Sequence, residues 1–449
     1  MDLPLAVERS AGEPMTVQVA AQLRAAMREG RLTAGERLPS SRRLAAALGV
    51  SRTVVTEAYE QLYAEGWLVG RHGSGTYVAD VLAVPAGDPP APPPAEPAGE
   101  MIDLRPGEPW TGDLDTPAWR RAWRAAAVLA PAAEPDPHGL PGLRAALTER
   151  MRRGRGVTCP VERVMVTRGA GNGLDLLAAT VLRPGDRVGV EDPGYPRART
   201  VLAARGLRVV PCPVDEQGLV VDGLPDDLRL IYTTPSHQYP LGGVLPVPRR
   251  QSLLAWARRT GALVAEDDYD GEFRYGGAPL PALYGLDPEV VVYLGTSAKI
   301  LTPAMGVGWL VARPDLVAAI AARRPELGDR TAVVPQEALR VLLDRGDLDR
   351  YLRRMRAEYA RRRAVVVGAL AGLRVRGDTA GLHLVVELPA PVADRVVRAA
   401  GARGVRLDTL SRHHAGSADP VHGLVIGYGA ARRSELRAAC ALVRELVLR

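Results

Sequence analysis

The sequence predicts a small module of three helices and a β-hairpin, followed by a large α/β part and a smaller α+β part. Two observations support this division of the 449 residues. Residues 81–100, VLAVPAGDPPAPPPAEPAGE, are rich in proline and alanine, which predicts an extended linker. After residue 101, short apolar runs alternate with helix-length segments, a pattern typical of a largely parallel sheet.

The composition excludes several classes of protein. The chain is 47% hydrophobic and 24% charged, and no apolar run is long enough to predict a membrane span. The start, MDLPLAVERS, lacks the pattern of a signal peptide. Three scattered cysteines (Cys159, Cys212 and Cys440) predict neither a disulfide framework nor a zinc cluster. We therefore expect a cytoplasmic protein without a membrane partner.

The first 80 residues carry clear helix signals. Helical apolar spacing over 16–29 predicts a first helix, which Gly30 ends. Ser40 and Ser51 can cap two further helices, 41–48 and 52–65. In the third helix, one buried stripe is expected from Val55, Ala58, Tyr59 and Leu62. The connection between helices two and three is very short, as in a helix-turn-helix. The segment WLVGRHGSGTYVAD then predicts two short strands around a glycine-rich tip, as in a wing.

In a helix-turn-helix, the start of the second helix of the motif faces the base edges, while the preceding helix and a wing reach the phosphates or the minor groove. The candidate DNA contacts are Arg42, Arg43, Ser51, Arg52, Thr53, Thr56, Arg71 and His72. Residues 1–80 hold nine arginines and nine acids, so charge alone also permits a helical interaction domain. The motif LPSSRRLAAALGVSRTVVTEAYEQLYAEGWLVGRHGSGTYV, however, resembles the winged helix-turn-helix of GntR-type regulators over residues 14–80. That resemblance implies binding to a double-stranded DNA operator.

Lys299, in VVYLGTSAKILTP, is the only lysine of the chain, and every other basic residue is arginine. Only a primary amine can condense with an aldehyde, so a site for pyridoxal 5′-phosphate (PLP) would require this residue. A lone surface lysine left by chance is the alternative. Lys299 follows an apolar strand, at the edge where open α/β sheets bind ligands.

Other polar residues are expected at the same edge. Asp267 ends a strand and could pair with a pyridine nitrogen, Tyr269 could reach the phenolate oxygen of the ring, and Tyr195 could stack on it. In TRGAGNGLDLLAA, the backbone amides of a helix N-terminus could bind phosphate. The residues assigned to the phosphate are Ala170, Gly171, Asn172, Thr296 and Ser297.

Five strings, RGAGNGLDL, EDPGYP, TPSHQYPLGG, EDDYDGEFRY and GTSAKILTP, together resemble the fold-type I aminotransferase architecture over about 101–449. We expect the large α/β part at about 130–325 and the smaller one at about 330–449. With the GntR-type head, the chain resembles the MocR/GabR subfamily of regulators. The resemblance implies PLP held as an aldimine on Lys299, a small-molecule effector (PLP, an amine or an amino acid), and a homodimer with exchanged heads.

The sequence departs from the family pattern at three positions. Gly306 stands where an arginine usually binds the cofactor phosphate, which predicts weaker binding of PLP. Val425 stands where aminotransferases carry the arginine for the substrate carboxylate, and Tyr239 replaces their asparagine. Arg412 is a possible substitute cation. The sequence therefore predicts a ligand-sensing regulator, with two alternatives: an active aminotransferase with a DNA-binding head, or a DNA-binding dimer whose body has lost PLP.

Overall fold

The computed structural model describes residues 5–10, 12–71, 75–80, 101–130, 134–278, 280–377, 379–416 and 420–449. The chain forms two compact units, Met1–Ala98 and Gly99–Arg449, called the head and the body below. The predicted linker 81–100 and the predicted contact His72 lie outside the described residues, as does the side chain of Arg71. None of the described helices is long and apolar enough to cross a membrane.

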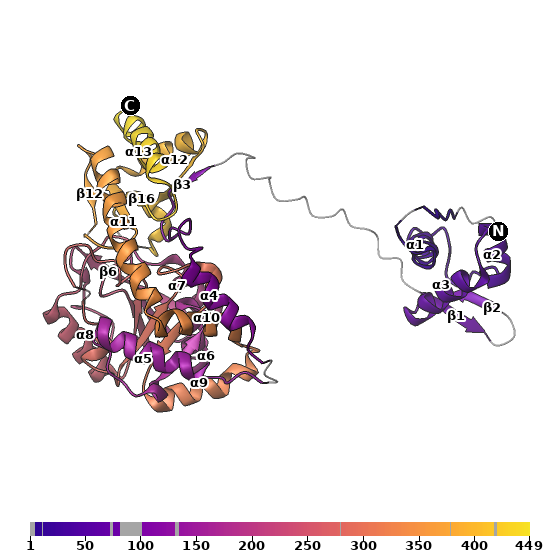
Figure 1. Ribbon diagram of the computed structural model, residues 1–449, viewed down its shortest axis with the longest axis horizontal. Helices are drawn as coiled ribbons and strands as arrows, with labels where there is room; N and C mark the ends of the chain where they lie inside the picture. Colours follow the sequence, from indigo (N-terminus) through magenta and orange to yellow (C-terminus); the bar gives the residue numbers. More distant parts are fainter. Residues whose placement is uncertain are drawn as a thin grey trace. The chain divides into compact units, whose positions relative to one another are not determined.

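The head has the predicted order of three helices and a hairpin (Figure 1). Its elements are α1 (Met15–Arg28), α2 (Ser41–Leu48), α3 (Arg52–Ala64), β1 (Leu68–Arg71) and β2 (Gly75–Val78). The hydroxyls of Ser40 and Ser51 cap α2 and α3, as predicted, and Gly49 ends α2 with φ 64°, which favours glycine. All four residues of the predicted stripe are buried in the core of the head.

The body is built on an eight-stranded sheet of order β4-β11-β10-β9-β8-β5-β6-β7. Strands β5, β6, β8, β9 and β10 pair in parallel, whereas β11 is antiparallel to both of its neighbours. The strands are β4 (Val164–Thr167), β5 (Arg187–Asp192), β6 (Arg208–Asp215), β7 (Gly218–Leu219), β8 (Leu230–Thr233), β9 (Leu263–Asp268), β10 (Val291–Thr296) and β11 (Gly308–Val311).

Helices cover both faces of this sheet (Figure 1). Side chains of β10 alternate between two cores, because successive residues of a strand point to opposite faces: Val291 and Tyr293 pack on one side, Val292 and Leu294 on the other. The helices are α4 (Pro117–Ala127), α5 (Pro141–Arg155), α6 (Ala170–Val181), α7 (Pro196–Ala204), α8 (Val247–Thr260), α9 (Pro314–Glu326), α10 (Val333–Asp344) and α11 (Asp347–Ala369), with 3-10 turns at Val161–Arg163, Leu283–Gly285 and Pro303–Met305.

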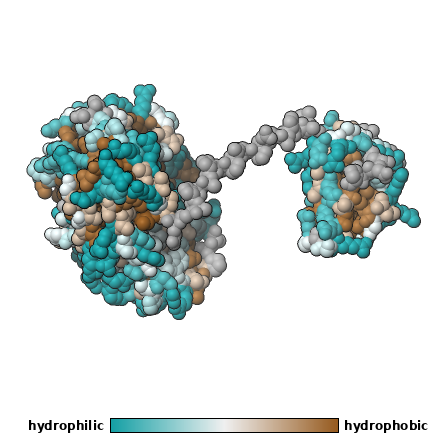
Figure 2. All heavy atoms as spheres, turned by 90° about the horizontal axis from the view of Figure 1, so that it is seen from above, coloured by the Kyte–Doolittle hydropathy of each residue, from teal (hydrophilic) through white to brown (hydrophobic). Residues whose placement is uncertain are grey.

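The smaller part of the body is an α+β unit around a second sheet of order β12-β13-β16-β15. Its elements are β12 (Val375–Arg376), β13 (His383–Glu387), α12 (Ala390–Gly401), β14 (Val405–Arg406), β15 (Asp408–Thr409), a 3-10 turn (Leu410–His413), β16 (Gly423–Gly427) and α13 (Arg433–Leu448). Figure 2 shows hydrophilic residues over much of the visible face of each unit, with hydrophobic ones between them.

The boundary of the smaller part differs from the predicted 330–449 in two ways. Helix α10 packs against α4 and α5, and so belongs to the large part. Conversely, β3 (Ile102–Asp103) pairs with β14 in parallel, so the first residues of the body join the smaller part. Helical periodicity identifies a buried face, but it does not say which sheet that face covers.

Candidate cofactor cavity and DNA-binding face

A cavity of about 700 Å³ lies at the edge of the large sheet where the parallel strands end. All nine predicted cofactor residues line it. They are Ala170, Gly171 and Asn172 at the start of α6, Tyr195 just before α7, Asp267 near the end of β9 and Tyr269 just after it, Thr296 at the end of β10, and Ser297 and Lys299 after it. The fold therefore brings these residues to one cavity, because strands that are distant in the chain end side by side.

Lys299 points its amine into this cavity and donates a hydrogen bond to the carbonyl oxygen of Gly107. Burial lowers the pKa of Lys299, and the carboxylates of Glu108 and Asp267 oppose that shift. A lowered pKa increases the fraction of neutral amine, which is the form that attacks a carbonyl group. Glu108 also lines the cavity, and no sequence signal singled it out.

Asp267 is 5% exposed, and only one of its two carboxylate oxygens has a hydrogen-bond partner among the described residues. Its Oδ2 accepts a hydrogen bond of 2.5 Å from the hydroxyl of Tyr232, whereas its Oδ1 has no partner among the described residues. Burial, reinforced by the neighbouring carboxylate of Asp268, raises the pKa of Asp267 to about 7. A buried carboxylate oxygen without a donor fits the protonated ring nitrogen of PLP, which would supply the missing hydrogen bond.

Aromatic rings form another wall of the cavity. Tyr239 lies edge-to-face against Tyr195 and Tyr269, with ring centroids 5.6 and 5.7 Å apart. The hydroxyl of Tyr269, predicted to meet the phenolate oxygen of PLP, lies 2.9 Å from Nδ1 of His237, which in turn lies 2.8 Å from Asp270. Tyr195 thus lies in the aromatic wall of the cavity, while the hydroxyl of Tyr269 already has a protein partner.

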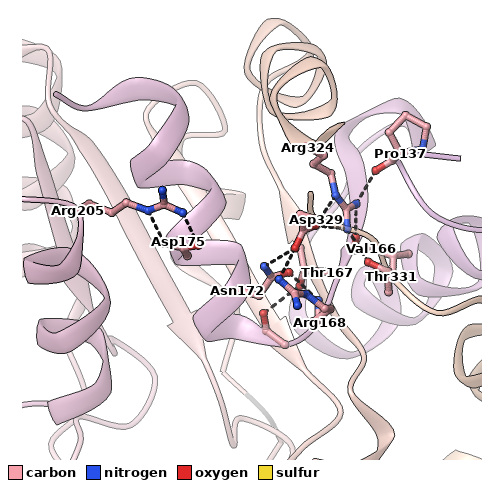
Figure 3. A network of polar contacts seen from close by, with 11 residues as sticks. Pro137, Val166, Thr167, Arg168, Asn172, Asp175, Arg205, Arg324, Asp329 and Thr331 are labelled. Atoms are coloured by element: carbon pink, nitrogen blue, oxygen red, sulfur yellow. Dashed lines mark hydrogen bonds and ion pairs between the residues drawn. The ribbon is translucent and has the colours of Figure 1, made fainter. Parts of the chain in front are cut away.

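A polar network holds the start of α6 in place (Figure 3). Asp329 accepts hydrogen bonds from Arg168, Asn172 and the buried Arg324, and Arg324 also donates to the carbonyl oxygens of Pro137 and Val166. The side chain of Asn172 is therefore engaged, which leaves its backbone amide for a ligand. The first helical hydrogen bond of α6 is donated by the backbone of Gly173, so the preceding amides are free to bind an anion.

Two further predicted residues, Thr296 and Ser297, lie where β10 ends. The hydroxyl of Thr296 accepts from the amide of Ala298 at 3.1 Å, and that of Ser297 donates to the carbonyl oxygen of Val307 at 2.6 Å. Ser297 can therefore act on a ligand only as an acceptor or through rearrangement. The phosphate contacts predicted at this edge rest mainly on Thr296 and the start of α6.

Gly306 lines the cavity with φ 60°, and a Cβ atom built there would meet nothing within 4 Å. A candidate replacement for the expected arginine is Arg197, in the first turn of α7, which also lines the cavity. Its Nε lies 3.6 Å from the Cβ position of Gly171, directly beside the start of α6. The sequence analysis missed Arg197 because one arginine among many gives no signal.

Neither Val425, at the position of the substrate-carboxylate arginine, nor the possible substitute Arg412 gives a cation to the cavity. Val425 is fully buried in an apolar cluster with Leu241, Val385 and Leu410. Arg412 forms an ion pair of 3.1 Å with Asp408, and its side chain is 65% exposed. Among the described residues, the smaller part contributes only Leu382 and His383 to the cavity wall.

The head presents the predicted DNA contacts on the first turns of α2 and α3. Arg42, Arg43, Ser51, Arg52 and Thr53 are exposed, and Thr56 is half-buried. The Nε of Arg52 lies 3.4 Å from the hydroxyl of Ser41, which joins the two helices of the motif. Thr56 donates its hydroxyl to the carbonyl oxygen of Arg52, so it offers DNA mainly its methyl group and acceptor lone pairs.

Comparisons with known proteins agree with both units. Residues 15–78 match the model of bacterial regulatory proteins of the gntR family, and residues 100–414 match that of aminotransferase class I and II. The chain is 38% identical to the HTH-type pyridoxine biosynthesis transcriptional regulator PdxR of Corynebacterium glutamicum, over 99% of each protein. It is 36% identical to the probable rhizopine catabolism regulatory protein MocR of Rhizobium meliloti, over 94% of this chain and 92% of that protein.

Solved structures support the fold of the body. An archaeal alanine:glyoxylate aminotransferase aligns with a TM-score of 0.72 at 21% identity, over 78% of this chain and 91% of that chain. LysN, an α-aminoadipate aminotransferase from Thermus thermophilus, aligns with a TM-score of 0.70 at 26% identity, over 78% and 92%. This fold is PLP-dependent in aminotransferases. The chain therefore belongs to the GntR-type helix-turn-helix transcriptional regulators that carry an aminotransferase class I and II domain, and it is a DNA-binding regulator.

Proposed function

We propose that the body of this regulator holds PLP in the cavity around Lys299, and that occupancy of this cavity changes how the head binds its operator. The observation behind the proposal is the meeting of three features in one cavity: the only lysine, an unpaired buried oxygen of Asp267 and the start of α6. They match the aldehyde, the ring nitrogen and the phosphate of PLP. When bound, PLP supplies an aldehyde that reacts with amines.

Each residue has a defined task in this proposal. The amine of Lys299 would attach the cofactor, and Asp267 would keep the ring nitrogen protonated. Tyr195 would cover the ring, and the amides of Ala170 and Gly171 would bind the phosphate together with Thr296. Arg197 would provide the positive charge that Gly306 lacks.

We further propose that PLP itself is the effector, in preference to an amino acid. An α-amino acid would need a cation for its carboxylate, and the smaller part provides none at Val425 or Arg412. The relative named as a regulator of pyridoxine biosynthesis supports an effector of this class. The family resemblance also supports a homodimer with exchanged heads, acting in the cytoplasm where its operator lies.

The test compares the full-length protein with Lys299→Ala and Lys299→Arg. The arginine variant is the matched control, because it keeps the positive charge but cannot condense with an aldehyde. The native protein should gain a visible absorbance band on addition of PLP, and borohydride treatment should attach the cofactor to the peptide containing Lys299. Neither variant should show the band.

The regulatory half of the proposal is tested on DNA. PLP should change the affinity of the native protein for the DNA upstream of its own gene and leave both variants unchanged, because a ligand shifts an equilibrium only by its differential affinity for the two states. A protein that shows no band at saturating PLP would refute the cofactor assignment. Sustained conversion of amino acids and keto acids would instead establish an active aminotransferase.

A further inference from the structure

The net positive charge of this DNA-binding protein comes from its body. Residues 1–80 hold nine arginines and nine acids, and residues 81–100 hold three acids and no basic residue. Residues 101–449 therefore carry 49 basic and 39 acidic residues, a net charge of +10, whereas residues 1–80 are neutral. Long-range attraction to DNA grows with net positive charge, and residues 1–80 carry none.

Most of this excess lies on two neighbouring helices. Helix α5 contains five arginines and one acid, and α11 contains seven arginines and three acids, a combined charge of +8. Figure 1 shows both helices on one side of the body, and an ion pair of 2.8 Å between Arg150 and Asp349 joins them. We call this side of the body the α5–α11 face.

Four of the arginines on these helices are structural and are not counted as free. Arg155 is 4% exposed and pairs with Asp268, and Arg362 is 2% exposed and donates to two backbone carbonyl oxygens and to Glu358. Arg144 donates to the carbonyl oxygens of Val161 and Val164, and Arg150, whose side chain is 12% exposed, pairs with Glu272 and Asp349. The remaining eight arginines face four acids. Arg152, Arg153, Arg350 and Arg361 have side chains that are 54–63% exposed.

A hollow between the two helices adds a second observation. A cavity of about 250 Å³ is lined by Arg150 from α5 and by Arg353 and Arg356 from α11. Arg353 is exposed and has no hydrogen bond or ion pair in the described ranges, and Arg356 uses only its Nε, on the carbonyl oxygen of Glu272. Unused donors of this kind fit an anionic partner.

We propose that the α5–α11 face binds the phosphate backbone of duplex DNA, in addition to the contacts made by the head. Arg350 and Arg361 are separated by roughly 16 Å along α11, or about five base-pair steps of duplex DNA. Guanidinium groups bind phosphate through paired hydrogen bonds. Such contacts carry no base specificity, so the face would add affinity and salt dependence without adding sequence preference.

The test uses the full-length variant Arg153→Gln/Arg353→Gln. Both side chains are exposed, so their replacement should leave the fold intact. The matched control, Arg395→Gln/Arg437→Gln, removes the same charge from α12 and α13, where both arginines are exposed and make no ion pair among the described residues. Fluorescence anisotropy would measure the dissociation constant on a duplex of the protein's own upstream DNA from 50 to 200 mM KCl.

Each lost phosphate contact should flatten the slope of log K against log[salt] by about 0.9, so the α5–α11 variant should lose about 1.8. At 150 mM salt this corresponds to about a fivefold loss of affinity for each contact, equal on the native and on a scrambled duplex. The control should keep the native slope. Equal slopes for the native protein and both variants would overturn the proposal and leave the α5–α11 face to another anionic partner. An equal change of slope in both variants would also overturn it, because the change would then reflect net charge alone.

Discussion

Asp267→Asn tests the electrostatics of the cavity directly. The substitution keeps the shape of the side chain and an oxygen for the hydroxyl of Tyr232, but it removes the charge. Burial raises the pKa of Asp267 from 3.8 to about 7, so ionisation of this group opposes folding. Below pH 3.8 the carboxyl is protonated in both states and has no effect. Between pH 3.8 and 7 only the unfolded chain loses the proton, so stability falls as pH rises, and above pH 7 the penalty is constant.

The magnitude follows from the size of the shift. Three pKa units correspond to about 4 kcal/mol, which is the full penalty above pH 7, and roughly 3 kcal/mol of it develops between pH 5 and 8. For a body of roughly 350 residues, 3 kcal/mol corresponds to about 4 °C in Tm. In the absence of PLP, the Tm of the variant should therefore exceed that of the native protein at pH 8. This difference in Tm should be about 4 °C larger at pH 8 than at pH 5.

Thermal unfolding of the body, followed by near-ultraviolet circular dichroism at both pH values, measures this difference. With PLP the order should reverse, because the ring nitrogen satisfies the carboxylate of the native protein and finds no charge in the variant. A difference that is independent of pH would refute the raised pKa of Asp267. A variant that PLP stabilises as strongly as the native protein would refute the pairing with the ring nitrogen.

Four other substitutions test the remaining contacts. Arg52→Ala should weaken binding to the native operator by about 1–3 kcal/mol and relax its sequence preference, whereas Arg43→Ala should weaken all duplexes equally; equal losses for Arg52→Ala on native and random DNA in anisotropy titrations would reduce Arg52 to a phosphate contact. Arg197→Gln should weaken PLP by roughly 10- to 100-fold and leave pyridoxal, which lacks the phosphate, unchanged in absorbance titrations. Gly306→Arg, for which the structure has space, should restore much of that loss, despite a positive φ that costs about 1–2 kcal/mol. If Arg197→Gln weakens PLP and pyridoxal equally, Arg197 does not bind the phosphate.

The sequence predicted the head accurately because its signals are local. Caps at Ser40 and Ser51 and the glycine at position 49 determine where α2 and α3 begin and end, without help from distant residues. The residues of the cavity were predictable for a different reason. Parallel strands end at a common edge, so Asp267 and Lys299, each following a recognisable strand, had to lie near one another.

The features that the sequence did not predict depend on long-range packing. Glu108 reaches the cavity because the chain around Gly107 packs against the smaller part, where its neighbour β3 pairs with β14, more than 300 residues later. Arg197 acts at the cavity because α7 packs beside α6. In both cases the residue type is common in this chain, and only the tertiary neighbours distinguish it from others of its kind.

The absence of an arginine at position 306 affects how ligand binding could reach the rest of the body. An arginine there would hold the phosphate from the loop after Lys299, within the large part. Arg197 would hold it from α7, and α7 also contacts the smaller part, since Arg199 donates hydrogen bonds of 2.6 and 2.7 Å to the carbonyl oxygens of His413 and Arg412. A phosphate bound by Arg197 would therefore act on α7, the helix that contacts the smaller part. We expect occupancy of the cavity to bias the position of the smaller part through α7, which is the kind of differential contact that a ligand-controlled regulator requires.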